Sequence, residues 1–160
     1  MEDKSVSRIL NALCTAAAVL VLLAGPAASV VINEMELNPP DGEVDWIEIY
    51  NPDNQSVDIS SWWAEIIDGS WTGSFEAVPA GTILPPGGFY VFNGQAAWAH
   101  DDGGYATLYS ASGEILDKTA KRLDSLNNDL TYGRTPDGYD TDKDSDWGLK
   151  SATKGESNIR

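Results

Sequence analysis

The stretch Asp45-Trp46-Ile47-Glu48-Ile49-Tyr50-Asn51 has the clearest periodicity in this 160-residue chain. In an extended strand, Ile47 and Ile49 point to one face, while Trp46, Glu48 and Tyr50 point to the other. Alternation of this kind, built from β-branched and aromatic residues, is typical of a strand that places one face on a hydrophobic core. Residues 45–51 therefore predict a β-strand and a sheet protein.

Seven further short runs lie on both sides of this stretch. Pro, Gly, Asn and Asp separate them, and no stretch of a dozen residues keeps a helical period. The runs occupy residues 30–37, 62–67, 74–78, 88–93, 105–110, 114–119 and 130–134. About eight short strands at this spacing predict an all-β chain folded as an immunoglobulin-like β-sandwich.

The first 29 residues have the organisation of a secretory signal peptide. Lys4 and Arg8 precede an apolar run at residues 9–24, and small residues follow up to Ser29. We expect a signal helix here, cleavage after Ser29 and one domain at residues 30–160. An uncleaved N-terminal anchor is the alternative. Both predict a secreted or cell-surface domain, and no later run approaches the ~18 apolar residues that cross a bilayer.

Charge is distributed very unevenly along the chain. The chain has 25 acidic and 10 basic residues, a formal net charge of −15, and no Lys or Arg between Arg8 and Lys118. Nucleic-acid binding needs clustered cations against phosphates, so we expect no nucleic-acid partner. The cations of the last third, which include Arg134, Lys143 and Lys150, are expected to pair with acids of earlier strands.

A series of short motifs follows the expected strands in a fixed order. The pieces are Val31-Ile32-Asn33-Glu34, residues 45–51, Asp58-Ile59-Ser60-Ser61-Trp62, residues 83–91, residues 108–117 and residues 132–138. The end of the chain supplies Thr153, Gly155 and Asn158. This series resembles the lamin tail domain in its secreted prokaryotic branch, whose closing T-P-G-x-x-N has its proline replaced by Lys154. The resemblance covers residues 30–158 and implies an immunoglobulin-like sandwich with a non-catalytic role in interactions.

An Asp-rich loop follows residue 139. Asp140, Asp142, Asp144 and Asp146 alternate with other residues, a pattern that can place several hard oxygen donors around one calcium ion. The loop departs from an EF-hand, because Ser145 stands where glycine is needed and no glutamate follows at the twelfth position. Calcium is thus a possible cofactor of this loop, and a solvated acidic turn is the alternative.

Three tryptophans are candidates for ligand binding. Trp62 and Trp63 are consecutive in an expected strand, so Trp63 faces outward if Trp62 enters the core. Trp71 and Trp98 lie near expected loop tips. Exposed rings can stack on sugar faces, so Trp63, Trp71 and Trp98 suggest recognition of a glycan. The alternatives are that these rings pack in the core and rim, or that the ligand is a protein of the cell envelope.

Carboxylates on the first two expected strands suggest an alternative, enzymatic function. Glu34, Glu36, Asp45 and Glu48 are expected on neighbouring strands, and glycoside hydrolysis needs only two carboxylates in a cleft. The rival to a binding module is therefore a small secreted hydrolase that uses paired carboxylates with calcium. We expect instead that Glu34 and Glu48 form a structural ion pair with Arg134 or accept backbone N–H groups. No catalytic residue is assigned.

Overall fold

The computed structural model describes residues 29–69, 71–94 and 103–158. The expected signal helix and Trp98 lie outside these ranges. The strands are β1 Val31–Glu36, β2 Trp46–Tyr50, β3 Val57–Asp58, β4 Trp63–Asp68, β5 Trp71–Ser74, β6 Ile83–Leu84, β7 Phe89–Asn93, β8 Gly104–Tyr109, β9 Ile115–Lys118, β10 Leu130–Arg134 and β11 Trp147–Ser151. A single-turn 3-10 helix, η1, spans Asp144–Asp146 just before β11.

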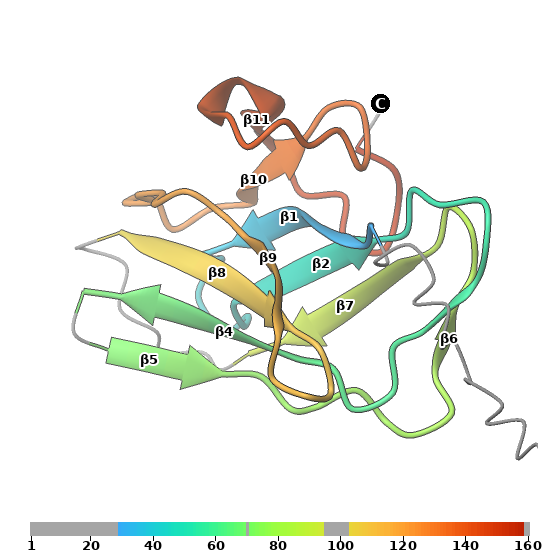
Figure 1. The fold of residues 1–160 in the computed structure, drawn as a ribbon. Helices are drawn as coiled ribbons and strands as arrows, with labels where there is room; N and C mark the ends of the chain where they lie inside the picture. Colours follow the sequence, from blue (N-terminus) through green and yellow to red (C-terminus); the bar gives the residue numbers. More distant parts are fainter. Residues whose placement is uncertain (1–28, 70, 95–102, 159–160) are drawn as a thin grey trace, which may run out of the picture.

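Two antiparallel sheets form the two layers of the domain (Figure 1). The larger sheet has the strand order β11-β10-β1-β2-β7, and the smaller has the order β5-β4-β8-β9. β3 and β6 pair separately as a short two-stranded ribbon. This arrangement confirms the predicted all-β, immunoglobulin-like sandwich.

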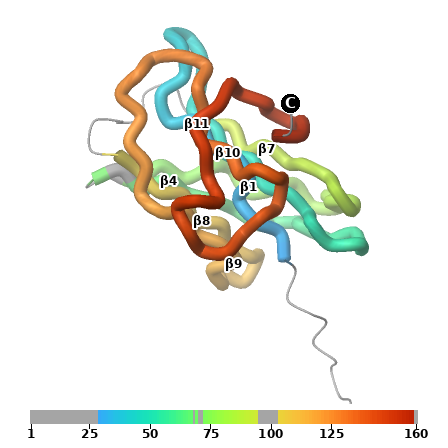
Figure 2. Tube along the Cα trace, turned by 90° about the horizontal axis from the view of Figure 1, so that it is seen from above, coloured from blue at the N-terminus to red at the C-terminus, as the bar shows by residue number. Residues whose placement is uncertain are grey.

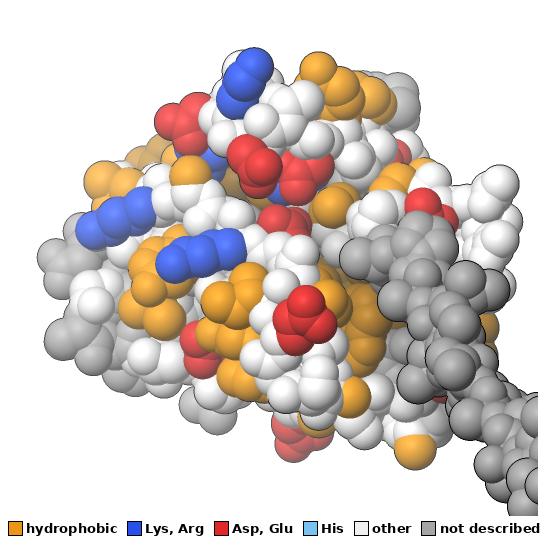
Figure 3. Space-filling view, in the orientation of Figure 1, with side chains coloured by type: hydrophobic (Ala, Val, Ile, Leu, Met, Phe, Trp, Pro, Cys, Tyr) orange, Lys and Arg blue, Asp and Glu red, His pale blue; other side chains and the backbone are white. Residues whose placement is uncertain are grey.

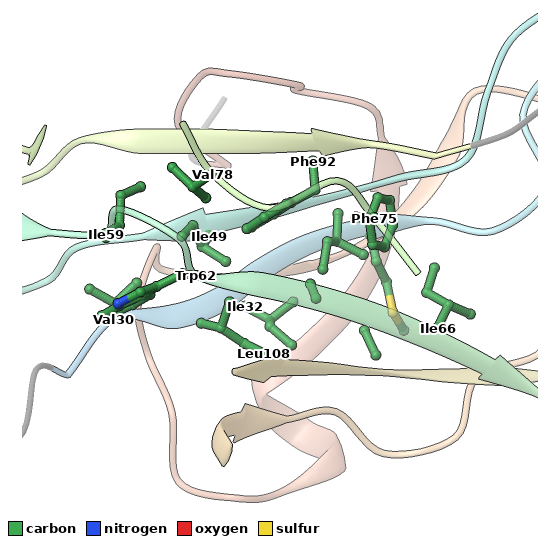
Figure 4. Close-up of a cluster of buried hydrophobic side chains, with 14 of the residues drawn as sticks. Val30, Ile32, Ile49, Ile59, Trp62, Ile66, Phe75, Val78, Phe92 and Leu108 are labelled. Atoms are coloured by element: carbon green, nitrogen blue, oxygen red, sulfur yellow. The ribbon is translucent and has the colours of Figure 1, made fainter. Parts of the chain in front are cut away.

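The hydrophobic core lies between the two sheets, as the period-two pattern predicts (Figure 4). Ile32 and Ile49 come from the larger sheet, and Ile66 and Leu108 come from the smaller one. All four side chains are buried, because alternate residues of each strand point toward the facing sheet. Side chains outside the strands, such as Ile59 and Val78, close the ends of this core.

The strand count exceeds the eight that the sequence predicts. Within the described residues, β3 and β6 contain only two residues each, and β11 reads Trp-Gly-Leu-Lys-Ser without regular alternation. The strand predicted at residues 74–78 lies earlier in the structure: β5 ends at Ser74 and pairs with β4. These differences arise because backbone pairing with a neighbouring strand outweighs weak local preference.

Strands β1 and β2 are buried on both faces. A β-bulge at Asn33 adds one residue to β1, so that Glu34 lies opposite Glu48 while Ile32 lies opposite Ile49. The bulge therefore keeps hydrophobic residues on the core face and both glutamates on the outer face. The residues after β11 lie over this outer face (Figure 2), which explains why Glu34 and Glu48 are completely buried.

No helix within the described ranges is long and apolar enough to span a lipid bilayer.

Candidate functional site

The outer face of β1 and β2 carries a buried polar network. Oε1 of Glu34 accepts a hydrogen bond from the hydroxyl of Thr131 and from the backbone N–H of Thr153 at 2.9 Å. Its Oε2 accepts from the Thr153 hydroxyl at 2.7 Å. Both carboxylate oxygens thus have donors, as a buried carboxylate requires.

Glu48 lies beside Glu34 in the same network. Its carboxylate accepts hydrogen bonds from Nδ2 of Asn33 at 3.1 Å and from the backbone N–H of Gly155 at 2.6 Å. The pKa of Glu48 is raised to about 7, mainly by burial and also by the charges of Glu34 and Asp137, while these two hydrogen bonds act in the opposite direction. Glu48 is therefore near its titration point at neutral pH.

The C-terminal segment closes over this network through its last described residues. Asn158 donates from Nδ2 to the backbone oxygen of Asn33 at 3.1 Å and from its N–H to Asp137 at 2.9 Å. Nζ of Lys150 donates to the backbone oxygen of Asn158. Thr153, Gly155 and Asn158, the positions that resemble a closing motif, are thus the residues that fasten the chain end to β1 and β2.

We expect Thr153→Val to lower the free energy of unfolding by about 2 kcal/mol, because it leaves a buried carboxylate oxygen of Glu34 without its hydroxyl donor. Urea denaturation followed by tryptophan fluorescence measures this change. Thr72→Val, at an exposed position of β5, is the matched control and should change stability little. Equal stability of the two variants would show that the segment is not fastened through Thr153.

Arg134 pairs with an acid of an earlier strand, as expected, but this acid is Asp117 and not Glu34 or Glu48. Its Nε donates to the backbone oxygen of Ile32 at 2.8 Å, and its guanidinium forms ion pairs with Asp140 at 2.8 Å and with Asp117 and Asp146 at 3.7 Å. The predicted ion pair with Glu34 and Glu48 is not what the structure contains. In the antiparallel pair of β1 and β10, Gly133 lies opposite Glu34.

The strand geometry explains this correction. Residues that follow one another in a strand point to opposite faces, so Arg134 points away from the face that Gly133 shares with Glu34. Thr131 is on the glutamate face and supplies the hydroxyl instead. Burial raises the pKa of Asp117, although Arg134 and the N–H of Ile32 oppose this shift. The alternation of side chains along β10 shows that Arg134 and Gly133 point to opposite faces. The face that Gly133 shares with Glu34 follows only from the register of β1 with β10.

The Asp-rich loop is arranged around cations and N–H groups. Asp140 faces Arg134, and Asp144 forms an ion pair with Arg122 at 3.3 Å. Asp146 is buried and accepts hydrogen bonds from Thr141 and Lys143. Burial alone would raise the pKa of Asp146, but these bonds and the charge of Arg134 lower it.

The four candidate calcium ligands are therefore not gathered at one point. The backbone N–H of Asp142 donates to Asp140, while the carboxylates of Asp140 and Asp146 are engaged as described above. In the described part of the chain, no group of three or more Asp, Glu, His or Cys side chains is placed to hold a metal ion.

Trp63 lies on the outer face of the smaller sheet. Its ring stacks on that of Tyr109, with centroids 3.9 Å apart and planes 7° apart. The register places Trp63, Tyr109 and Ile115 in one row across β4, β8 and β9, and Ile115 is 57% exposed. Trp62 is buried in the core, as the alternation predicts. Trp71 is the first residue of β5, but its side chain and Trp98 are outside what the structure describes.

Polar groups border this aromatic row. The hydroxyl of Tyr109 donates to Oε1 of Glu65 at 2.6 Å, and this hydrogen bond raises the pKa of Tyr109. Nζ of Lys118 lies 4.1 Å from the centre of the Tyr105 ring. The outer face therefore offers ring surface beside an oriented carboxylate and an ammonium group. The sequence identified Trp63, whereas the partners from β8 and β9 depend on strand register.

The acids considered for hydrolysis are packed inside the domain. Glu34, Glu36, Asp45 and Glu48 are all buried, and none lines either of two surface pockets of about 270 and 220 Å³ formed by described residues. Burial raises the pKa of Glu36 to about 8, with further contributions from the charges of Asp124 and Asp45. The raised pKa of Glu36 therefore accompanies burial inside the domain, away from these two pockets.

A family model described as Lamin Tail Domain matches residues 24–129. This range includes β1 to β9 and ends immediately before β10. The cationic Arg134, the Asp-rich loop and the closing C-terminal segment lie beyond it. No curated protein matches the chain.

Proposed function

Because the chain belongs to the lamin tail domain family, we propose that it is a non-catalytic binding module, secreted or held at the cell surface, that recognises a glycan of the cell envelope. The sandwich supplies a rigid support for a binding face. The signal-like residues 1–29 support an extracellular location, with Lys4 and Arg8 preceding an apolar run and small residues.

The observation that carries this proposal is the aromatic row on the outer face of the smaller sheet. Trp63 and Tyr109 present rigid ring surface, which loses little conformational entropy on binding. Glu65, held by the Tyr109 hydroxyl, keeps acceptor capacity for a sugar hydroxyl. Apolar C–H faces of a sugar suit the rings, and its hydroxyls suit the carboxylate.

The residues considered for the rival hydrolase support a structural role. Glu34 and Glu48 accept hydrogen bonds that fasten the C-terminal segment, and removing them from this network would expose the inside of the domain. A hydrolase needs its acid and base at a surface that a substrate reaches. The binding proposal therefore uses the partly exposed ring row, whereas the acids of the hydrolase proposal are buried.

Binding to a glycan and envelope-fragment array tests the proposal. We expect Trp63→Ala to weaken binding of the retained glycan at least about tenfold, equivalent to about 1.4 kcal/mol. Tyr139→Ala is the control, because this tyrosine is 50% exposed but lies outside the row. Thermal melting establishes that both variants are folded.

A second variant separates the rings from the carboxylate. Tyr109→Phe keeps the stack on Trp63 but removes the hydroxyl that orients Glu65, so we expect a smaller loss than for Trp63→Ala. If the wild-type domain retains no glycan, or if Trp63→Ala and Tyr139→Ala bind equally well, the proposed function is wrong.

A further inference from the structure

We propose that the recognised glycan carries an acidic sugar residue, whose carboxylate binds in the 270 Å³ pocket lined by Lys118, Arg122, Lys143 and Trp147. This inference rests on the proposed function and names the class of sugar. The pocket lies between β9, the following loop and the Asp-rich loop before β11. Figure 3 shows acidic and basic side chains gathered over this part of the surface.

Four cationic side chains line this pocket. Arg134 is one of them, but Asp117, Asp140 and Asp146 surround this guanidinium. The residues that line the pocket carry the four cations of Lys118, Arg122, Arg134 and Lys143 and the three carboxylates of Asp140, Asp142 and Asp144.

Among the described residues, the two lysines are not neutralised by carboxylates, although the Lys118 ammonium lies over the Tyr105 ring. Within the described ranges, no ion pair engages the ammonium group of Lys118 or Lys143. This cationic site is unusual in a chain of net charge −15 that has no Lys or Arg between residues 8 and 118.

Arg122 has unused capacity for a carboxylate. Its Nη1 contacts the carboxylate of Asp144, whose side chain is 79% exposed. Its Nε and Nη2 are buried without a hydrogen-bond partner among the described residues. These two nitrogens form the guanidinium edge that a carboxylate matches with two parallel hydrogen bonds. Because these two nitrogens are buried, a ligand carboxylate can pair with them only after the exposed Asp144 has moved away from Nη1, and Asp144 loses little on returning to water.

The position of Lys118 connects this pocket with the aromatic row. In β9, Lys118 lies opposite Thr107, and Ile115 lies opposite Tyr109 in the same pair of strands. A sugar chain seated on Trp63 and Tyr109 thus reaches Lys118 by extending along β8 and β9. The two surfaces are neighbouring parts of one face, which favours a glycan over an unrelated small anion.

The volume of the pocket and the net charge of the protein restrict the size and the charge of the ligand. A pocket of about 270 Å³ is smaller than the ~300–1,000 Å³ of sites for drug-sized ligands, so it suits one sugar residue. The acidic remainder of the protein repels a polyanion. The structure therefore favours a single acidic sugar in an otherwise neutral glycan.

Calorimetric titration with two matched glycans tests this inference. The probes are a neutral oligosaccharide retained on the array and the same oligosaccharide with its terminal sugar oxidised to the uronic acid. We expect the acidic probe to bind about tenfold more tightly at low salt, and added salt to reduce this preference. Arg122→Gln and Lys143→Gln should remove the preference and leave the affinity for the neutral probe unchanged.

The controls distinguish this inference from the proposed function. Lys121→Gln makes the same charge change at an exposed lysine that does not line the pocket, and should keep the preference. Lys143 is itself exposed, so its variant tests the pocket without disturbing the core.

Each outcome decides one of the two proposals. Trp63-dependent binding with equal affinities for the two probes overturns the acidic-sugar inference and leaves the proposed function in place. Failure of both probes to bind overturns the proposed function. An acidic peptide that binds as tightly as the acidic sugar, with the same loss in Arg122→Gln, overturns the assignment of the pocket to a sugar.

Discussion

Replacing Arg134 with glutamine should lower the free energy of unfolding by about 3–5 kcal/mol. The guanidinium is buried and forms ion pairs with Asp117, Asp140 and Asp146, and it donates to the backbone oxygen of Ile32. Glutamine removes the positive charge, so buried carboxylates are left facing each other without compensation. Equilibrium urea denaturation at pH 7 measures the loss.

Two further variants establish the electrostatic origin of this loss. Lys121→Gln removes the same charge from an exposed side chain, and its stability should change by less than about 0.5 kcal/mol. Adding Asp117→Asn to Arg134→Gln should recover part of the stability, because it removes one of the uncompensated carboxylates. An Arg134→Gln protein as stable as Lys121→Gln would contradict the structural role of this residue.

The free energy of unfolding should fall by several kcal/mol, on the order of 5, as the pH rises from 5 to 8.5. Burial raises the pKa of Glu36 to about 8 and that of Glu48 to about 7, from an ordinary value of 4.5. At a pH between 4.5 and these raised pKa values, the two glutamates are ionised in the unfolded chain but still protonated in the folded chain. The folded state therefore binds more protons, and raising the pH favours unfolding.

The other carboxylates with shifted pKa values do not reverse this sign. The pKa of Asp117 is raised, which adds to the same trend. The pKa values of Asp58 and Asp146 are lowered from 3.8, so these groups are ionised in both states throughout the window. Thermal melting across pH 5–8.5 at constant ionic strength measures the trend.

Glu36→Gln isolates the largest contribution to this dependence. Its Oε1 accepts a hydrogen bond from the N–H of Asn38 at 2.9 Å, and an amide oxygen can keep this bond. We expect the variant to be more stable than the wild type by ~4 kcal/mol at pH 8.5 and nearly equal to it at pH 5. A pH profile that is unchanged in Glu36→Gln would show that this carboxyl does not titrate with the folding equilibrium.

These predictions describe a domain whose last third fastens the rest together. Arg134 links β10 to β9 and to the Asp-rich loop, and the closing segment from Thr153 to Asn158 covers the glutamates of β1 and β2. The family match ends at residue 129, before these contacts. The polar interactions beyond the match are thus as much a part of this fold as its hydrophobic core.

The sequence by itself determined the class of fold and the core. Alternation in residues 45–51 was enough to place Ile47 and Ile49 inside, and the consecutive Trp62 and Trp63 were enough to send one ring inward and the other outward. Such inferences succeed because strand period depends on residues that are adjacent in the chain. The ordered motifs supplied the family for the same reason, since each is a local run.

Only the tertiary structure decided which charges meet. The bulge at Asn33 placed Glu34 opposite Glu48, and the register of β1 with β10 turned Arg134 toward Asp117 instead of either glutamate. Some of the buried hydrogen bonds join residues that are 85 and 119 positions apart. One residue of register moves a side chain to the other face of a sheet, so local periodicity predicts that such residues are polar but does not select their partners.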